Sequence, residues 1–214
     1  MSKTTAPLLS FDARGQIGKS QVYSSWKGRA YARRYVIPAN PKSAEQTKTR
    51  SAFAWLQSVY KVLPAAVKDG WVAYANTSRI TGANAFLKGN LSNLRGKIDL
   101  DMFIMSPAAN SGLPAASSES TAGAAKITVT VAADTLPTGW TIKEARAAVI
   151  RDQDPQTADY TAVKAGSSKA APYSIEIAGL TVGVAYKTGA WFVYNKPDGT
   201  LAYGEAIMSE ATPT

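Results

Sequence analysis

The chain has 214 residues, 45% of them hydrophobic, and contains neither cysteine nor histidine. This composition supports a sizeable core but excludes disulfide frameworks, thiolate nucleophiles, cysteine–histidine zinc sites and imidazole-based catalysis. Residues 1–97 carry 16 Lys and Arg against 3 Asp and Glu, a net charge of +13, whereas residues 98–214 carry 8 against 12, a net charge of −4. The basic part therefore favours an acidic partner, either nucleic acid or an acidic protein surface.

The N-terminal residues predict an extended arm followed by a β-hairpin. Residues 1–19 show no periodicity and are rich in small and polar side chains, so we expect an arm that orders on a partner. Residues 20–26 and 29–37 are aromatic-rich segments on either side of Lys27-Gly28, which predicts two strands and a tight turn. No apolar run is long enough for a membrane span or a signal sequence, so we expect no membrane partner and synthesis in a cytoplasm.

The next residues predict three short helices around a common core. Prolines in the segment 38–41 end the preceding strand, and Ser43 caps the first helix. Pro64 suits the first turn of a second helix, and Thr81 caps a third. Apolar residues recur at helical spacing, which indicates a small bundle. The largest of these residues are Trp55, Trp71 and Phe86.

The remaining residues predict a linker and an all-β domain. Residues 106–125 are dominated by Ser, Ala, Gly and Pro, which is typical of a linker or long loop. Residues 126–214 contain short alternating segments separated by turn signals, which predicts an antiparallel sandwich. The expected strands are 127–131, 147–150, 160–163, 173–177, 186–194 and 201–208.

Residues 13–20 also admit a nucleotide-binding interpretation. Their sequence, ARGQIGKS, nearly matches a phosphate-binding loop but has Ala13 in place of the first glycine. Such a loop needs a buried strand before it and a helix after it, whereas the residues that follow have a strand pattern. An accidental match is therefore the better interpretation.

The basic and aromatic stretch of the hairpin predicts a docking face. Its candidate residues are Lys27, Arg29, Tyr31, Arg33, Arg34 and Tyr35. Alternation along a strand would separate Arg34 from Arg29, Tyr31, Arg33 and Tyr35. Interleaved cations and rings suit nucleic acid, through phosphate contacts and base stacking, and they suit protein equally. Because charge alone does not establish base readout, docking on a protein is the favoured interpretation.

Few other residues suggest chemistry. The close carboxylate pairs Asp99/Asp101 and Asp152/Asp154 could serve catalysis or calcium binding, but such pairs on loops are usually solvated. We therefore assign no catalytic, cofactor-binding or metal-binding residue, and we predict that the chain is not an enzyme. Trp191 and Tyr203 are candidates for stacking on a carbohydrate, and packing inside the sandwich explains them equally well.

Part of the C-terminal region resembles a known module. The pattern Leu180-x-x-Gly183-x-x-Tyr186 follows Tyr173-x-Ile175-x-Ile177 and is similar to the E-to-F strand region of fibronectin type III and immunoglobulin-like modules. In those modules the tyrosine forms a corner that ties a loop to a strand. The expected fold is thus α+β and multidomain: an arm (1–19), a basic hairpin with a three-helix docking domain (20–105), a linker (106–125) and an immunoglobulin-like antiparallel sandwich (126–214).

Residues 23–90 resemble a poorly characterised domain of tailed-bacteriophage virion proteins. The most specific element is Pro38-x-Asn40-Pro41-x-Ser43-x-x-Gln46. The resemblance implies a virion structural protein that docks on the capsid, neck or tail in several symmetric copies and projects an immunoglobulin-like module. The alternatives are a nucleic-acid-binding protein that uses the basic part and a module that binds carbohydrate or a host surface.

Overall fold

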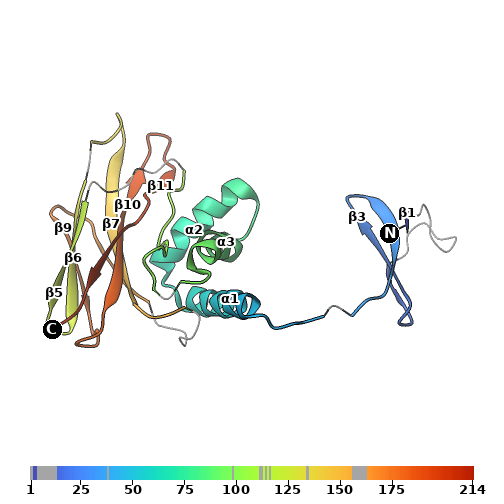
Figure 1. The fold of residues 1–214 in the computed structure, drawn as a ribbon. Helices are drawn as coiled ribbons and strands as arrows, with labels where there is room; N and C mark the ends of the chain where they lie inside the picture. The colour runs from blue at the N-terminus through green and yellow to red at the C-terminus, as the bar shows by residue number, and fades with distance from the viewer. Residues whose placement is uncertain are drawn as a thin grey trace. The chain divides into compact units, whose positions relative to one another are not determined.

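The computed structural model divides the chain into two compact units, Met1–Lys42 and Ser43–Thr214 (Figure 1). The residues that it describes are 2–3, 14–37, 39–97, 99–110, 113, 115, 117–133, 135–155 and 163–214. The charge is divided unequally between the two units. Residues 1–42 carry eight Lys and Arg against one Asp, a net charge of +7, which leaves +2 for residues 43–214.

The N-terminal unit is a four-stranded antiparallel sheet in the order β1-β4-β3-β2. Its strands are β1 (Ser2–Lys3), β2 (Gly15–Ile17), β3 (Gln21–Trp26) and β4 (Arg29–Arg34). The predicted hairpin is confirmed, because β3 and β4 pair across a two-residue turn. Lys27 and Gly28 have φ values of 50° and 75°, the left-handed conformation that a type I′ turn requires at both positions.

The described part of the predicted arm forms two strands of the sheet instead of an extended, unpaired segment. β1 pairs with β4 and β2 pairs with β3, so these residues belong to the sheet. The reason is local, since Gly18 at φ 54° allows the chain to reverse and lets β2 return along β3. Residues 1 and 4–13 of the arm, and Pro38, lie outside the described residues. Strand β4 ends at Arg34, three residues earlier than predicted.

Three helices open the C-terminal unit, as the sequence predicts. They are α1 (Ala44–Val62), α2 (Ala65–Ser78) and α3 (Gly82–Leu94). Ser43 caps α1 and Thr81 caps α3, each accepting a hydrogen bond from the backbone N–H three residues later. The predicted centre is also present: Trp55, Trp71 and Phe86 are buried, and the last two rings meet edge to face at 5.3 Å. Within the described residues, no helix is long and apolar enough to cross a membrane.

Two antiparallel sheets complete the C-terminal unit, which is therefore α+β with sandwich-like layers. One sheet has the order β5-β6-β9, and the other has the order β11-β10-β7-β8 with β12 also paired to β10. The strands are β5 (Ser117–Gly123), β6 (Lys126–Ala132), β7 (Thr141–Arg151), β8 (Lys164–Ser168), β9 (Tyr173–Ala178), β10 (Tyr186–Asn195), β11 (Leu201–Tyr203) and β12 (Ile207–Ala211). The predicted strand 201–208 is split into β11 and β12, and the one at 160–163 lies outside the described residues apart from Val163.

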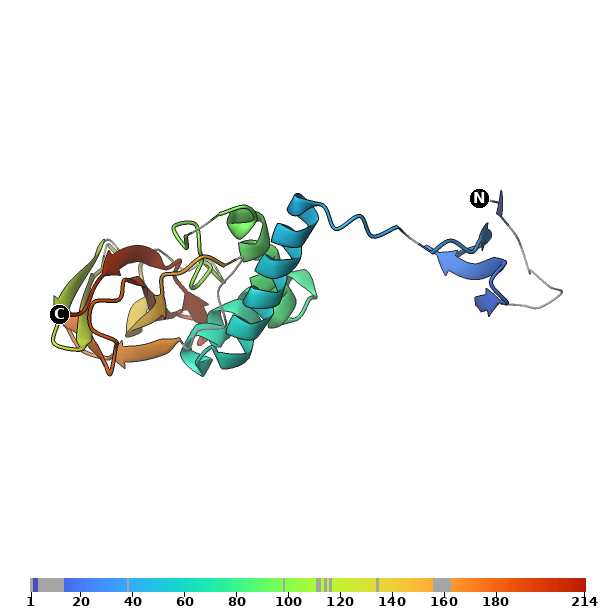
Figure 2. The ribbon, with the colours of Figure 1, turned by 60° about the horizontal axis from the view of Figure 1, so that its bottom comes forward.

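The helices pack on the outer face of the sheet that contains β7 and β10 (Figures 1 and 2). Trp191 and Ile150 from this sheet share one core with Trp55 and Phe86 from the helices. On the opposite face, Phe192 belongs to a second core between the two sheets. Strand β10 is consequently buried at nine of its ten residues, which explains the continuous apolar run at residues 190–194.

The boundary between units lies at residues 42 and 43, whereas the sequence predicted it within or just before 106–125. Strand β5 occupies part of that segment, and Ala109 forms two backbone hydrogen bonds with Tyr203, of 2.9 and 3.0 Å. The composition of this segment did not predict β5, because hydrogen bonds between hydroxyl groups take the place of apolar packing in this strand. The Ser120 hydroxyl lies 2.6 Å from that of Thr188 and 2.7 Å from that of Ser209, and both distances indicate hydrogen bonds between strands.

Tyr186 forms the corner that its sequence pattern predicts. Its hydroxyl accepts a hydrogen bond from the backbone N–H of Thr181 at 3.1 Å and so ties the preceding loop to β10. We expect Tyr186→Phe to lower the free energy of unfolding by about 1 kcal/mol, because one hydrogen bond is lost while the packing stays. Urea denaturation measures this change. Tyr173→Phe is the control, since the Tyr173 hydroxyl makes no hydrogen bond within the described residues; equal losses in the two variants would contradict the role of the corner.

Candidate docking surface

The residues predicted as a docking face lie on or beside one hairpin of the N-terminal unit. Arg29, Tyr31 and Arg33 occupy alternate positions of β4 and share one face of the sheet, whereas Arg34 belongs to the opposite face. Tyr35 follows the strand and donates its backbone N–H to the carbonyl of Ser20 at 2.8 Å. The structure therefore groups three predicted residues on β4 and separates Arg34 from them.

Strand β3 adds a tryptophan to the face that carries Arg29 and Arg33. Trp26 pairs with Arg29 beside the turn, and the Nζ of Lys27 lies 4.8 Å from the centre of its ring. We name this surface the tryptophan face. Its residues are Val22, Ser24, Trp26, Arg29, Tyr31 and Arg33. Sequence reasoning missed Trp26, although a two-residue turn at Lys27-Gly28 pairs it with Arg29.

The opposite surface of the sheet has more small side chains and carries less charge. We name it the alanine face. Its residues are Gln21, Tyr23, Ser25, Ala30, Ala32 and Arg34. The Tyr23 hydroxyl donates a hydrogen bond to Oε1 of Gln21 at 2.8 Å, so these two polar groups satisfy each other. Arg34 is the one charged residue of this face.

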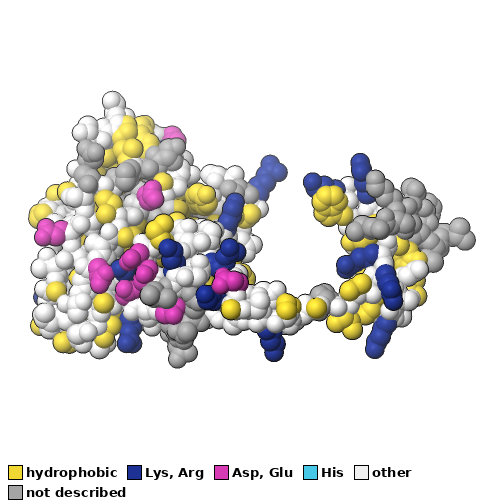
Figure 3. All heavy atoms as spheres, viewed as in Figure 1, with side chains coloured by type: hydrophobic (Ala, Val, Ile, Leu, Met, Phe, Trp, Pro, Cys, Tyr) yellow, Lys and Arg dark blue, Asp and Glu magenta, His cyan; other side chains and the backbone are white. Residues whose placement is uncertain are grey.

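No described side chain between residues 14 and 42 is buried. Large apolar side chains are instead open to solvent there: Ile17 is 48% exposed, Trp26 67%, Val36 64% and Ile37 74%. Figure 3 shows apolar and basic side chains side by side on this unit. A small sheet needs an apolar face packed against another element to be stable alone. Within its described residues, the N-terminal unit is therefore a single sheet that has two solvent-exposed faces and no hydrophobic core of its own.

The nucleotide-binding interpretation of residues 13–20 does not agree with the structure. Gly15–Ile17 is strand β2, residues 18–20 form the turn, and β3 follows directly. A phosphate-binding loop instead requires a helix whose N-terminus faces the phosphates. Ala13 lies outside the described residues.

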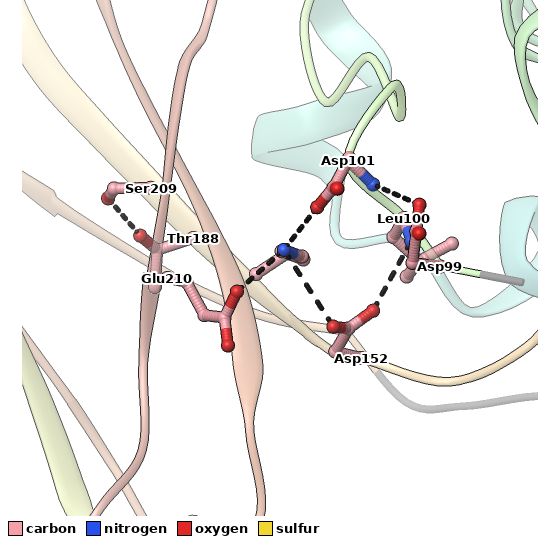
Figure 4. A network of polar contacts seen from close by, with 8 residues as sticks. Asp99, Leu100, Asp101, Asp152, Thr188, Ser209 and Glu210 are labelled. Carbon is pink, nitrogen blue, oxygen red and sulfur yellow. Dashed lines mark hydrogen bonds and ion pairs between the residues drawn. The ribbon is translucent and has the colours of Figure 1, made fainter.

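The two predicted carboxylate pairs contribute to a cluster around Lys187 in the C-terminal unit (Figure 4). The Nζ of Lys187 on β10 lies 2.5 Å from Oδ1 of Asp101, 2.6 Å from Oε2 of Glu210 and 3.7 Å from Oδ2 of Asp152. Asp152 also accepts a hydrogen bond from the backbone N–H of Leu100 at 3.3 Å. The cluster thus joins the segment after α3 to β10, to β12 and to the end of β7.

The electrostatics of this cluster fit a structural role. Burial alone would lower the pKa of Lys187, but hydrogen bonds to Asp101 and Glu210 and the charge of Asp152 raise it above its ordinary value. The side chain of Lys187 is only 11% exposed, but the surrounding carboxylates outweigh the effect of burial, and the lysine remains charged at neutral pH. Across the described ranges, no group of three or more acidic, His or Cys side chains is arranged to hold a metal ion.

A second ionic contact joins α2 to the sheet. Arg146 on β7 donates hydrogen bonds to Oδ2 of Asp69 at 3.0 Å and to the carbonyl of Ala66 at 2.7 Å. Its Nε also donates to Oε1 of Glu144 at 2.8 Å. Burial would lower the pKa of Arg146, but these carboxylates raise it. The contact fixes the helices on the sheet.

The two candidate carbohydrate-stacking residues are both packed inside the C-terminal unit. Trp191 is fully buried in the core shared by helices and sheet, and Tyr203 is buried beside Val193. Stacking on a sugar requires an open ring face, which neither side chain presents.

Comparison with known proteins adds little to this description. No protein-family model matches the chain, and no curated protein matches it. A solved structure described as "Myokine structure" is similar at 12% identity, covering 48% of this chain and 98% of that chain with a TM-score of 0.33. At that TM-score the likeness carries no argument about fold or function.

Proposed function

We propose that the chain is a non-enzymatic structural protein of a tailed-bacteriophage particle. It docks on the capsid, neck or tail through the N-terminal unit, while the C-terminal unit is displayed. The observation that carries the proposal is the N-terminal sheet, whose described side chains between residues 14 and 42 include none that is buried. Such a sheet gains a core only by packing against another surface. The virion assignment itself rests on the resemblance of residues 23–90 to phage virion proteins.

Charge supports an acidic partner for this unit. Its net charge of +7 is concentrated in 42 residues, so attraction to an acidic surface raises the association rate and orients the encounter. Many symmetric copies on one particle would add their contacts, and each contact could then be modest.

We also infer that the sandwich is immunoglobulin-like, of the fibronectin type III kind. The sheet order β5-β6-β9 opposite a sheet centred on β7 and β10 supports this inference, because it corresponds to strands A-B-E opposite C-F-G. The tyrosine corner at Tyr186 lies at the matching place, at the first residue of the sixth strand of the sandwich.

Quantitative mass spectrometry of purified, nuclease-treated particles of the encoding phage tests the proposal. We expect the chain in a fixed ratio to the major capsid protein, and a ratio that matches shell, neck or tail symmetry identifies the location. Absence of the chain from particles would contradict the proposed function. Release of the chain by nuclease would favour nucleic acid as its partner instead.

A further inference from the structure

We propose that the tryptophan face binds an acidic protein surface, with Trp26 as the anchor and Arg29 and Arg33 as the charged contacts. The inference rests on the proposed function and adds the face, the residues and the chemistry of the partner. The partner surface would present carboxylates around an apolar depression that receives the indole ring.

The two faces of the sheet differ in what they offer a partner. The tryptophan face combines two exposed arginines with an indole that is 67% exposed. The alanine face combines small side chains with one arginine and with Ile17, which pairs with Gln21 and is 48% exposed; its tyrosine hydroxyl is already hydrogen-bonded. Tryptophan and arginine are the residue types that dominate binding energy at protein interfaces. The specific contact therefore belongs to the tryptophan face.

The geometry around Trp26 prepares it for docking. Its strand is held by the pairing with β4, and the ammonium group of Lys27 lies 4.8 Å from the ring centre, so one cation already accompanies the indole. Arg29 lies directly across the hairpin on the same side. Guanidinium groups bind carboxylates through two parallel hydrogen bonds, which gives the contact a defined orientation.

Exposed aliphatic side chains favour protein over nucleic acid as the partner. Val36 and Ile37 follow β4 and are 64% and 74% exposed, whereas Ile17 on β2 pairs with Gln21 and so belongs to the alanine face. Bases and phosphates satisfy rings and cations, but they offer little apolar surface to aliphatic groups. A protein surface can cover both kinds of side chain.

The size of the face sets how strongly one copy can bind. Six-residue strands span about 20 Å, and neighbouring strands lie about 4.8 Å apart, so the two strands that carry the tryptophan face cover on the order of 200 Å². A stable interface usually buries about 800 Å² on each partner. A single tryptophan face is therefore a weak contact, and retention on the particle depends on neighbouring contacts and on copy number.

The matched pair Arg33→Glu and Arg34→Glu tests the inference. These two neighbours are both exposed and lie on the same strand, but they belong to opposite faces. The two substitutions therefore change the net charge equally and differ in the face that they alter. Each full-length variant replaces the native chain in the phage, and its amount per major capsid protein is measured in nuclease-treated particles. We expect at least about a 10-fold loss for Arg33→Glu and less than a twofold change for Arg34→Glu.

A second variant removes the anchor without changing charge. We expect Trp26→Ala to reduce incorporation to a similar extent as Arg33→Glu, while size-exclusion chromatography shows the variant to be as soluble and compact as the native chain. Because Trp26 is not part of the C-terminal core, urea denaturation of that unit stays unchanged and shows that the loss is not caused by misfolding of the C-terminal unit.

The possible outcomes separate the inference from the proposed function. Absence of the native chain from particles would overturn both the proposed function and the inference about the tryptophan face. Native chain present, with Arg33→Glu and Arg34→Glu incorporated equally, overturns the tryptophan face and leaves the structural role standing. Native chain present but released by nuclease assigns the face to nucleic acid and overturns the protein partner. Selective loss of Arg33→Glu and Trp26→Ala from nuclease-resistant particles supports the inference.

Discussion

Replacement of Trp191 by alanine is expected to lower the free energy of unfolding of the C-terminal unit by about 3–5 kcal/mol. Trp191 lies on β10 and is fully buried between the sheet and the helices, in one core with Trp55, Trp71 and Phe86. Alanine would leave a cavity at the centre of that core, because helices and sheet approach it from both sides and cannot both collapse into it. Urea denaturation followed by circular dichroism and by tryptophan fluorescence measures the loss.

Phenylalanine substitutions separate packing from hydrogen bonding in the same core. The Nε1 of Trp191 has no hydrogen-bond partner among the described residues, whereas the Nε1 of Trp71 donates to the carbonyl of Met105 at 3.0 Å. We therefore expect Trp71→Phe to destabilise by about 1–3 kcal/mol more than Trp191→Phe, because it leaves a buried carbonyl unpaired. A loss below about 1 kcal/mol for Trp191→Ala would contradict the shared core.

Lys187→Met is expected to lower the free energy of unfolding by about 2–4 kcal/mol at pH 7. The substitution keeps the length of the side chain but removes the cation that Asp101, Asp152 and Glu210 surround. Three carboxylates are then left without the positive charge that holds them together. The loss is somewhat smaller than for a fully buried ion pair, because the side chains of Asp101 and Glu210 are 62% and 50% exposed.

Lys126→Met is the matched control for this variant. Lys126 pairs with Glu176 at 2.8 Å on the same sandwich, but the two side chains are 41% and 54% exposed, so we expect a loss below about 1 kcal/mol. The pKa of Lys187 is raised in the folded chain. The stability that the charged lysine contributes is therefore fully present below the pKa of lysine in the unfolded chain, about 10.4, and is lost as pH rises through the pKa in the folded chain. The difference between Lys187→Met and the native chain is therefore expected to stay constant from pH 7 to pH 9.

The sequence was sufficient for elements whose signals are local. Helix caps at Ser43 and Thr81 and the turn at Lys27-Gly28 each depend on residues close by in the chain, and all three appear where they were predicted. Strand β5 escaped prediction because its residues are small and polar, although it pairs with β6, which follows it directly in the chain. The hydroxyl groups that it contacts, on Thr188 and Ser209, are distant in sequence, and such contacts leave no apolar periodicity in the strand itself.

The division into units was predictable only in part. Composition indicated a break near residues 106–125, but it cannot report that Trp191 and Ile150 complete the core of the helices. Apolar residues on both sides of β10 were a signal of this, because a strand with one solvated face alternates and β10 does not. The candidate docking residues were chosen by residue type, and the split between Arg33 and Arg34 follows from strand alternation alone.

The burial of β10 on both faces also affects synthesis. Helix α3 ends at Leu94 and β10 begins at Tyr186, so the ribosome adds about 90 residues after the helices before it makes the strand that covers them. At about 5–20 residues per second, the apolar side of the bundle remains open for roughly 5–20 s. Nascent chains in that interval expose Trp55 and Phe86, and chaperones that bind apolar segments are expected to associate with them until β10 emerges.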